Sequence, residues 1–199
     1  MFNLAQLNIA KMKFSLEDPR VADFVNALDR VNASAEASTG FVWRLQTEEG
    51  DVTAVQIHDG DLLLVNMSVW ESIDHLKAFV SSREHLEIMG RRGEWFDPAD
   101  LPYLVLWWIP AGQIPTVDEA QGKLDRLREH GPSEHAFNFS APYPPPSPVK
   151  LERQLQTELG DIQERIRNYP QPITACDEQF NWLLDERERV STELARIDG

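Results

Sequence analysis

The sequence predicts an α+β protein in which a ferredoxin-like sandwich is followed by a C-terminal helical hairpin. The first observation is the order of elements. Apolar segments of strand length and amphipathic segments follow one another as strand, helix, two strands, helix and strand, with one additional strand between the helices. Apart from that strand, this is the connectivity of the sandwich. The second is a proline-rich stretch at residues 141–148, typical of an extended linker. The third is a pair of helical hydrophobic patterns that follows the linker.

Short apolar runs bounded by turn residues predict the strands of the sheet. They are residues 2–9, 42–46, 52–57, 62–69 and 103–109, with a polar turn at 47–50. The last run, YLVLWWI, is apolar enough that both of its faces must be covered. One face of such a sheet would stay bare in a single chain. We therefore expect a homodimer in which two sheets face each other.

Helix start signals predict four helices before the proline-rich stretch, over residues 19–37, 72–80, 83–96 and 116–130. Asp18 followed by Pro19 combines an N-cap acceptor with a proline at the first helical position. Ser72 stands where the strand before it gives way to a helical pattern. Thr116 and Glu119 form a capping box that opens the last of these helices.

The proline-rich run divides the chain into three expected parts. They are an α/β-barrel domain at residues 1–140, a linker at 141–149 and an αα-hairpin at 150–199. Apolar residues spaced by three or four run from Leu151 to Tyr169, and a second helical stripe runs from a cap at Thr174 to Ile197. Two helices alone are not expected to bury both stripes fully. The hairpin should therefore pack on the barrel, on a second copy or on another protein.

Composition limits the classes of function. The formal net charge of -14 argues against nucleic acid or an anionic membrane surface as the main partner. Cys176 is the single cysteine, which excludes an intramolecular disulfide and a metal cluster made only of cysteines. The N-terminus lacks the pattern of a signal peptide, and no apolar run approaches the roughly 18 residues of a membrane span. We expect a cytoplasmic protein.

Several runs of the sequence resemble a bacterial domain family of unknown function in the dimeric α/β-barrel superfamily. They are LAQLNIA, FVWRLQ, VNMSVWES and PYLVLWWIPAGQIPT, and they lie within residues 1–146. The resemblance implies a ferredoxin-like dimeric α/β barrel. Within that superfamily the nearest functional analogues are antibiotic-biosynthesis-type monooxygenases and haem-degrading enzymes. Gln113 stands where the resemblance leads us to expect a histidine.

The segment from Leu62 to His85 locates the candidate pocket, because a buried strand ending in Trp70 leads straight into a helix. This order is typical of small barrels that bind apolar ligands between a sheet and its helices. Polar residues on the strands can project toward a cavity, which we expect on the side of the dimer partner. The candidate catalytic residues are His85 and Asn8. The candidate substrate-binding residues are Trp70, Arg44, Asn66, Ser68, Phe79 and Trp107.

Each candidate also has a purely structural interpretation. His85 could act as a donor or base near neutral pH, or it could bond a loop beside its helix. Arg44, a cation among apolar neighbours, predicts a partner carboxylate or an anionic ligand, and alternatively an interface salt bridge. The tryptophans could line an aromatic-ligand site or form core and dimer contacts. His75 is expected to face solvent.

A haem site of the haem-degrading type is incomplete in this sequence. The resemblance to those enzymes requires an asparagine on the first strand, a tryptophan in the second helix and a histidine ten residues later. Asn8 fits, but the other two positions fall on Phe79 and Met89. Methionine can bind haem iron but does not favour oxygen activation as histidine does. We therefore expect no cofactor and no metal, and we keep haem as an alternative.

The leading hypothesis is a cofactor-independent monooxygenase-like enzyme acting on a small apolar or aromatic substrate in a barrel pocket. It follows from a predicted pocket without metal-ligand spacing, a phosphate loop or a nucleophile elbow. One alternative is a non-catalytic ligand-binding or assembly protein whose segment 150–199 recruits a protein partner. The other alternative is a haem-binding protein.

Overall fold

The structure is a computed structural model, and it describes residues 1–46, 55–58, 61–170 and 178–197. It forms two compact units, residues 2–144 and, together with Met1, residues 145–199. The turn predicted at 47–50 and the helix start predicted at Thr174 lie outside the described residues.

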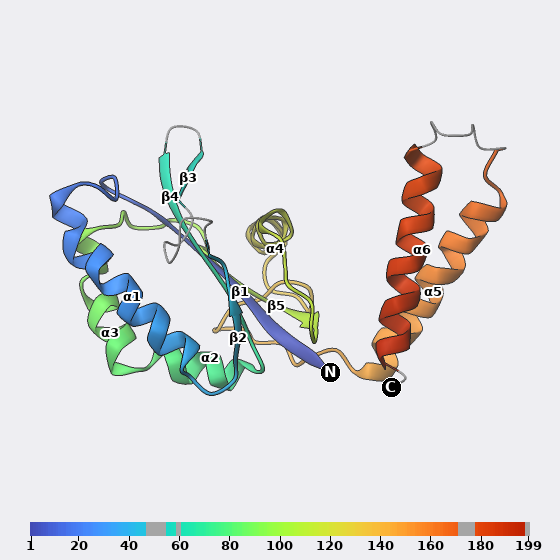
Figure 1. The fold of residues 1–199 in the computed structure, drawn as a ribbon, viewed down its shortest axis with the longest axis horizontal. Coiled ribbons are helices and arrows are strands. Elements are labelled where there is room, and N and C mark those ends of the chain that lie inside the picture. Colours follow the sequence, from blue (N-terminus) through green and yellow to red (C-terminus); the bar gives the residue numbers. More distant parts are fainter. Residues whose placement is uncertain (47–54, 59–60, 171–177, 198–199) are drawn as a thin grey trace. The chain divides into compact units, whose positions relative to one another are not determined.

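The first unit contains an antiparallel sheet with the strand order β2-β4-β1-β5, and β3 pairs with β4 as well (Figure 1). The strands are β1 (Phe2–Lys11), β2 (Phe41–Arg44), β3 (Val55–His58), β4 (Asp61–Trp70) and β5 (Leu104–Pro110). With helices after β1 and β4, this order is that of a ferredoxin-like sandwich. The predicted fold class is therefore confirmed.

The helices begin where their start signals predict. They are α1 (Ala22–Glu36), α2 (Ile73–Val80), α3 (Arg83–Gly90) and α4 (Val117–His130). Ser72 and Thr116 cap α2 and α4, and the Asp18 side chain caps the 3₁₀ turn Pro19–Val21 that leads into α1. The third helix ends at Gly90 and a 3₁₀ turn follows it. The prediction that it continues to Phe96 is wrong, because two glycines interrupt the segment.

The sheet is covered on both sides within one chain. Helices α1, α2 and α3 lie on one side, and α4 lies on the other (Figure 1). We name these sides the three-helix face and the α4 face. On the α4 face, buried apolar side chains of the strands pack against those of α4: Ala5, Leu7, Val65, Met67, Val69, Val105, Trp107 and Ile109 against Ala120, Leu124 and Leu127. The expectation of a bare face is wrong, since α4 supplies the missing layer.

The three-helix face carries two separate apolar clusters. One joins Trp70 and Leu4 of the sheet to Leu76 of α2. The other joins Leu64 of the sheet to Phe24 of α1. The sheet surface between these clusters carries polar side chains.

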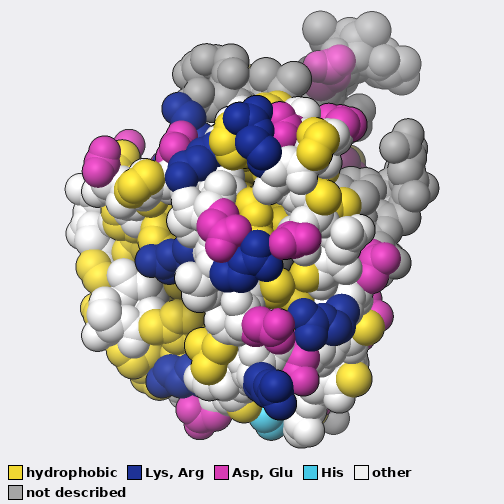
Figure 2. Space-filling model, turned by 90° about the vertical axis from the view of Figure 1, so that its left-hand side faces the viewer, with side chains coloured by type: hydrophobic (Ala, Val, Ile, Leu, Met, Phe, Trp, Pro, Cys, Tyr) yellow, Lys and Arg dark blue, Asp and Glu magenta, His cyan; other side chains and the backbone are white. Residues whose placement is uncertain are grey.

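Ion pairs link the outer surfaces of α1 and α3. Arg91 contacts Asp23 of α1 at 2.9 Å, and Arg30 contacts Glu87 of α3 at 3.5 Å. Figure 2 looks at this side of the molecule and shows Lys and Arg side chains interspersed with Asp and Glu. Such exposed pairs contribute little to stability, so the buried contacts beneath them position the helices.

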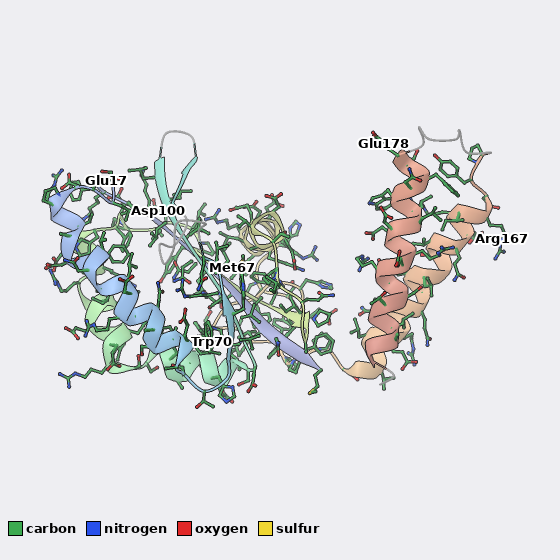
Figure 3. The ribbon with its side chains drawn as sticks, in the orientation of Figure 1. Glu17, Met67, Trp70, Asp100, Arg167 and Glu178 are labelled. Carbon is green, nitrogen blue, oxygen red and sulfur yellow. The ribbon has the colours of Figure 1, made fainter. Side chains whose placement is uncertain are left out.

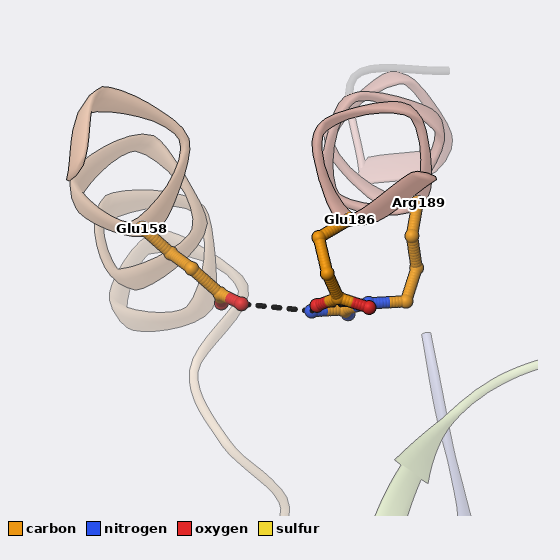
Figure 4. Close-up of polar contacts among 3 residues, drawn as sticks. All are labelled: Glu158, Glu186 and Arg189. Atoms are coloured by element: carbon orange, nitrogen blue, oxygen red, sulfur yellow. Dashed lines mark hydrogen bonds and ion pairs between the residues drawn. The ribbon is translucent and has the colours of Figure 1, made fainter. Parts of the chain in front are cut away.

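The second unit is a pair of helices, α5 (Pro148–Arg167) and α6 (Glu178–Ile197). Their apolar stripes face each other and bury Leu155, Ile162, Leu183 and Val190. Arg189 of α6 donates to Glu158 of α5 at 2.7 Å and to Glu186 at 2.9 Å (Figure 4). The predicted stripes thus find much of their burial in each other. Trp182 stays about half exposed, at 49%.

Candidate functional site

On the three-helix face of the sheet, polar and apolar side chains occupy separate rows that run across the strands. Strand pairing aligns one residue of each strand in a row, and alternate rows share a face. The rows are Phe41–Trp70–Leu4–Trp108, Arg44–Ser68–Gln6–Leu106, Asn66–Asn8–Leu104 and Leu64–Ala10. An irregularity in the register between Phe41 and Trp43 allows both Phe41 and Arg44 to lie on this face. Two polar rows are therefore flanked by an aromatic row and an aliphatic one.

We name the five polar side chains in these rows the polar band: Gln6, Asn8, Arg44, Asn66 and Ser68. Gln6, Arg44 and Ser68 are buried, Asn8 is half-buried and Asn66 is exposed. Asn66 lies where the partner of β4 changes, because β2 pairs with β4 up to Ser68 and β3 pairs with it from Leu64. Solvent therefore reaches one end of a polar surface that is otherwise covered.

Helix α1 crosses this band with polar residues of its own. Asn32 is buried, and Glu36 follows it one turn later. The Arg44 Nε donates to a carboxylate oxygen of Glu36 at 2.7 Å. The sequence left a partner carboxylate, an anionic ligand and an interface salt bridge open for Arg44, and the structure supplies a carboxylate from the same chain. The pair therefore links the last turn of α1 to β2 through a charge-assisted hydrogen bond.

Side-chain hydrogen bonds join three residues of the band to Trp70. The indole Nε1 of Trp70 donates to Ser68 Oγ at 2.8 Å. The Nε2 of Gln6 donates to Ser68 Oγ and to Asn66 Oδ1, both at 3.0 Å. Buried polar groups require such partners, and the network locks Ser68 and Gln6 into single orientations.

A chain of aromatic rings extends from Trp70 toward α3. Trp70 stacks on Phe79 of α2 with ring centroids 5.2 Å apart. Phe79 in turn meets the imidazole of His85 edge to face, again with centroids 5.2 Å apart. The predicted residues Trp70, Phe79 and His85 are thus brought together by contact. Figure 3 labels Trp70, near the end of β4.

His85 is held in one tautomer by its surroundings. Ser82 caps the helix by accepting from the His85 backbone, and the imidazole Nδ1 lies 3.0 Å from the Val80 carbonyl oxygen. A carbonyl only accepts, so Nδ1 carries the proton and Nε2 keeps a lone pair. Burial lowers the pKa of His85, and the bond to Val80 partly opposes this. The ring is therefore a neutral base at neutral pH. The structural interpretation of His85 was a hydrogen bond to a neighbouring loop, whereas the observed acceptor is the carbonyl of Val80, the last residue of α2.

Trp107 does not belong with this group. It is buried on the α4 face, where its indole Nε1 donates to Glu119 at 3.0 Å. Its neighbour Trp108 occupies the three-helix face in the row of Trp70. The prediction that Trp107 lines a pocket with Trp70 is wrong, because adjacent residues of a strand point to opposite faces.

Two further expectations are corrected. The polar strand residues were expected to face a dimer partner, but they lie on the three-helix face, as the contact of Arg44 with α1 requires. His75 was expected to face solvent. The side chain is 33% exposed, but its Nδ1 is buried and the ring packs against Gly40. Gly40 has a φ of 76°, so a side chain there would be strained and would also collide with the imidazole.

Sequence reasoning missed Gln6 and Glu36. Gln6 could have been found, because it precedes Asn8 by two residues and so shares its face of β1. Glu36 could not, since nothing local indicates that the last turn of α1 reaches β2. The pairing depends on how the helix packs on the sheet.

A cavity of about 370 Å³ opens beside the Arg44–Glu36 pair at the edge strand β2. Its walls are Glu36, Phe41, Val42, Trp43, Arg44 and Gln46.

Among the described residues, no three His, Cys, Asp or Glu side chains come together as metal ligands. Within the same described part of the chain, no helix is long and apolar enough to cross a membrane. Met89, at the predicted position of a haem ligand, is half-buried on α3.

The fold and the site together define a ferredoxin-like α+β domain with a polar band beneath its helices. The chain belongs to the family described as a domain of unknown function (DUF3291), whose model matches residues 3–153. The predicted family resemblance is confirmed. The match reaches seven residues beyond the predicted limit of 146, into α5.

Three solved structures illustrate the similarity of fold. SnoaB, a cofactor-independent oxygenase from Streptomyces nogalater, is 16% identical, with 57% of this chain and 97% of that chain covered and a TM-score of 0.35. A protein of unknown function from Nitrosomonas europaea is 13% identical, with 58% and 97% covered and a TM-score of 0.39. A dimeric ferredoxin-like protein from Bacteroides fragilis is 10% identical, with 54% and 94% covered and a TM-score of 0.38. No curated protein matches the chain.

Proposed function

We propose that this protein is a cofactor-independent monooxygenase-like enzyme that binds a small apolar or aromatic substrate between the sheet and helices α1–α3. The observation that carries the proposal is the polar band. Hydrogen-bonding side chains occupy the middle of a covered sheet face, between two apolar clusters. A core built only for stability would be apolar there. Few, well-placed polar groups in apolar surroundings are typical of a ligand site.

Without a cofactor, the substrate itself must supply the electrons that reduce oxygen. A phenol with an unsubstituted para position meets this requirement. Phenol and O₂ give the para-quinone and water, so one oxygen atom enters the ring and the other leaves with two substrate hydrogens. The protein then has to hold the ring, remove the phenolic proton and stabilise the oxygen anion that forms.

The described residues provide groups for each of these tasks. Phe79 is half-buried and stacked on the fully buried Trp70, so the Phe79 ring can contact a substrate ring. The lone pair on His85 Nε2 can accept the phenolic proton. Asn66, Ser68 and Asn8 can donate hydrogen bonds to the resulting oxygen anion.

Oxygen consumption tests this proposal directly. An oxygen electrode would follow the protein with 1-naphthol and a panel of other electron-rich phenols, with the products identified by mass spectrometry. Loss of a general base lowers turnover by roughly 10²–10⁴-fold, so we expect such a decrease for His85→Gln. His130→Gln is the matched control, because that side chain is 63% exposed at the end of α4. Absence of both turnover and binding across the panel would refute the proposal.

A second candidate is a non-catalytic binding or assembly protein that recruits a partner through residues 150–199. The exposed Trp182 favours it, since a large apolar side chain on a helix surface is a common interaction site. Affinity purification of the wild type and of Trp182→Ala, followed by quantitative mass spectrometry, would compare their partners. A partner lost only with Trp182→Ala supports recruitment. Identical recoveries argue against it.

The homodimer stays a prediction on a new basis. Strand β2 is at the edge of the sheet, with Val42 exposed and Trp43 half-buried, and edge strands with apolar side chains favour pairing. Light scattering of the wild type and of Val42→Lys would test it, with a dimer expected to become a monomer.

Haem binding, the third candidate, is tested by reconstitution of the protein with haemin and a search for a Soret band. A cytoplasmic location stays an expectation too.

A further inference from the structure

We infer that Gln6 determines the ligand selectivity of the proposed pocket, by forcing Ser68 and Asn66 to act as hydrogen-bond donors to a neutral oxygen acceptor such as a ring ketone. The inference rests on the proposed function for the existence of the pocket. It adds a positioning residue and a chemical class of ligand. Gln6 itself is 7% exposed and acts through its two neighbours.

Both lone pairs of the Ser68 hydroxyl accept hydrogen bonds from groups of the protein. A hydroxyl has two lone pairs and one proton. The Trp70 indole N–H, which can only donate, takes one lone pair at 2.8 Å, and the Gln6 Nε2 takes the other at 3.0 Å. The hydroxyl proton must therefore be given to a third group. The part of the chain that the structure describes offers no acceptor for it.

Asn66 is oriented by the same glutamine. Both hydrogens of Gln6 Nε2 are committed, one to Ser68 Oγ and one to Asn66 Oδ1. The Asn66 oxygen therefore points to Gln6 and its NH₂ group points away. Asn66 is also the exposed member of the polar band, so this NH₂ group is accessible to an incoming molecule.

Two donors then lie side by side on one face of β4, two residues apart. They match an oxygen that accepts hydrogen bonds and reject a ligand whose only polar group is a donor. The nearby cation does not favour an acid, because Arg44 is already paired with Glu36 at 2.7 Å. A neutral carbonyl fits these two donors, as does the oxygen of the proposed phenol once His85 has accepted its proton.

The amide of Gln6 determines that Ser68 and Asn66 donate hydrogen bonds to the ligand. A substitution at Gln6 can turn these two donors away from the ligand. In Gln6→Glu a carboxylate that only accepts replaces the donating amide. The Ser68 hydroxyl and the Asn66 NH₂ group would turn toward it and be lost to the ligand. Trp70 would still donate to Ser68, so its indole N–H reports whether the site remains folded.

The experiment compares 1-indanone with indane, which has the same rings and no carbonyl. Binding is followed by the Trp70 indole signal in ¹H–¹⁵N spectra, assigned with Trp70→Phe. We expect the wild type to bind 1-indanone about tenfold more tightly than indane, as one good hydrogen bond provides. In Gln6→Glu the ratio should fall to about one. Gln163→Glu, which adds the same charge at an exposed position of α5, should keep the wild-type ratio.

Each outcome decides between the two proposals. If the wild type binds neither probe, the pocket is refuted and the inference fails with it. If it binds both equally, the pocket stands and the donor polarity is refuted. A tenfold preference that survives in Gln6→Glu shows that Gln6 has no such role. Should Gln6→Glu not fold, Ser68→Ala provides the second test, because removal of the hydroxyl must also reduce the preference.

Discussion

The two faces of one sheet differ although the same strands build both. On the α4 face the buried side chains of β1, β4 and β5 are apolar. On the three-helix face the polar band interrupts the apolar packing and leaves two clusters. Because side chains alternate along a strand, one set of residues can serve stability while the intervening set is free to serve binding. We therefore expect substitutions on the α4 face to lower the free energy of unfolding, and substitutions at the adjacent positions on the three-helix face to weaken ligand binding.

Met67 and Asn66 are adjacent on β4 and provide the largest expected contrast. Met67 is 2% exposed on the α4 face, so Met67→Ala should lower the free energy of unfolding by about 2–5 kcal/mol. Asn66→Ala removes an exposed acceptor of Gln6 that water can replace, so it should cost less than about 1 kcal/mol while weakening ligand binding. Urea denaturation of both variants measures the difference. Equal losses would show that the two faces are not specialised.

Ser68→Ala should have the next largest effect. It leaves the Trp70 indole N–H and one hydrogen of Gln6 buried without their acceptor, which costs about 1–3 kcal/mol. Ser68→Thr is the matched comparison, since it keeps the hydroxyl. Urea denaturation together with the chemical shift of the Trp70 indole proton follows both. An unchanged indole shift in Ser68→Ala would contradict the observed bond.

The fold was predictable because its signals are local. The residue type and spacing of Ser72 and Thr116 predict the starts of two helices, and in the structure both residues are N-caps. The candidate site was predictable only in part. Polar residues such as Asn8 identify an unusual strand face, but which layer covers that face depends on contacts distant in sequence. The prediction that Trp107 lines a pocket with Trp70 is wrong for this reason, since only the register of β5 with β1 shows that Trp108 shares the face of Trp70.

The Arg44–Glu36 pair tests how α1 is held over the polar band. Glu36→Gln keeps an oxygen for the 2.7 Å hydrogen bond but removes the charge opposite a buried guanidinium. Because the Glu36 side chain is 43% exposed, solvent screening reduces the loss, and we expect about 1 kcal/mol. Arg44→Met with and without Glu36→Gln completes a double-mutant cycle in urea. A coupling energy near zero would mean that apolar contacts alone place α1.

The smallest expected effect is the pH dependence that His85 contributes to stability. Burial beside Phe79 lowers the pKa of His85 in the folded state relative to the unfolded value of 6.5. The unfolded chain therefore binds the proton more readily. The contribution is fully present above pH 6.5 and is lost as the pH falls through the folded-state pKa.

His85→Gln removes this dependence because glutamine does not titrate. Between neutral pH and the folded-state pKa of His85, the wild type should lose stability relative to His85→Gln, as measured by urea denaturation at a series of pH values. His130→Gln should follow the wild type, since that ring is exposed. Parallel curves for the wild type and His85→Gln would mean that the His85 imidazole is as well solvated in the folded state as in the unfolded chain. A site on the three-helix face that excludes water from His85 is incompatible with that result.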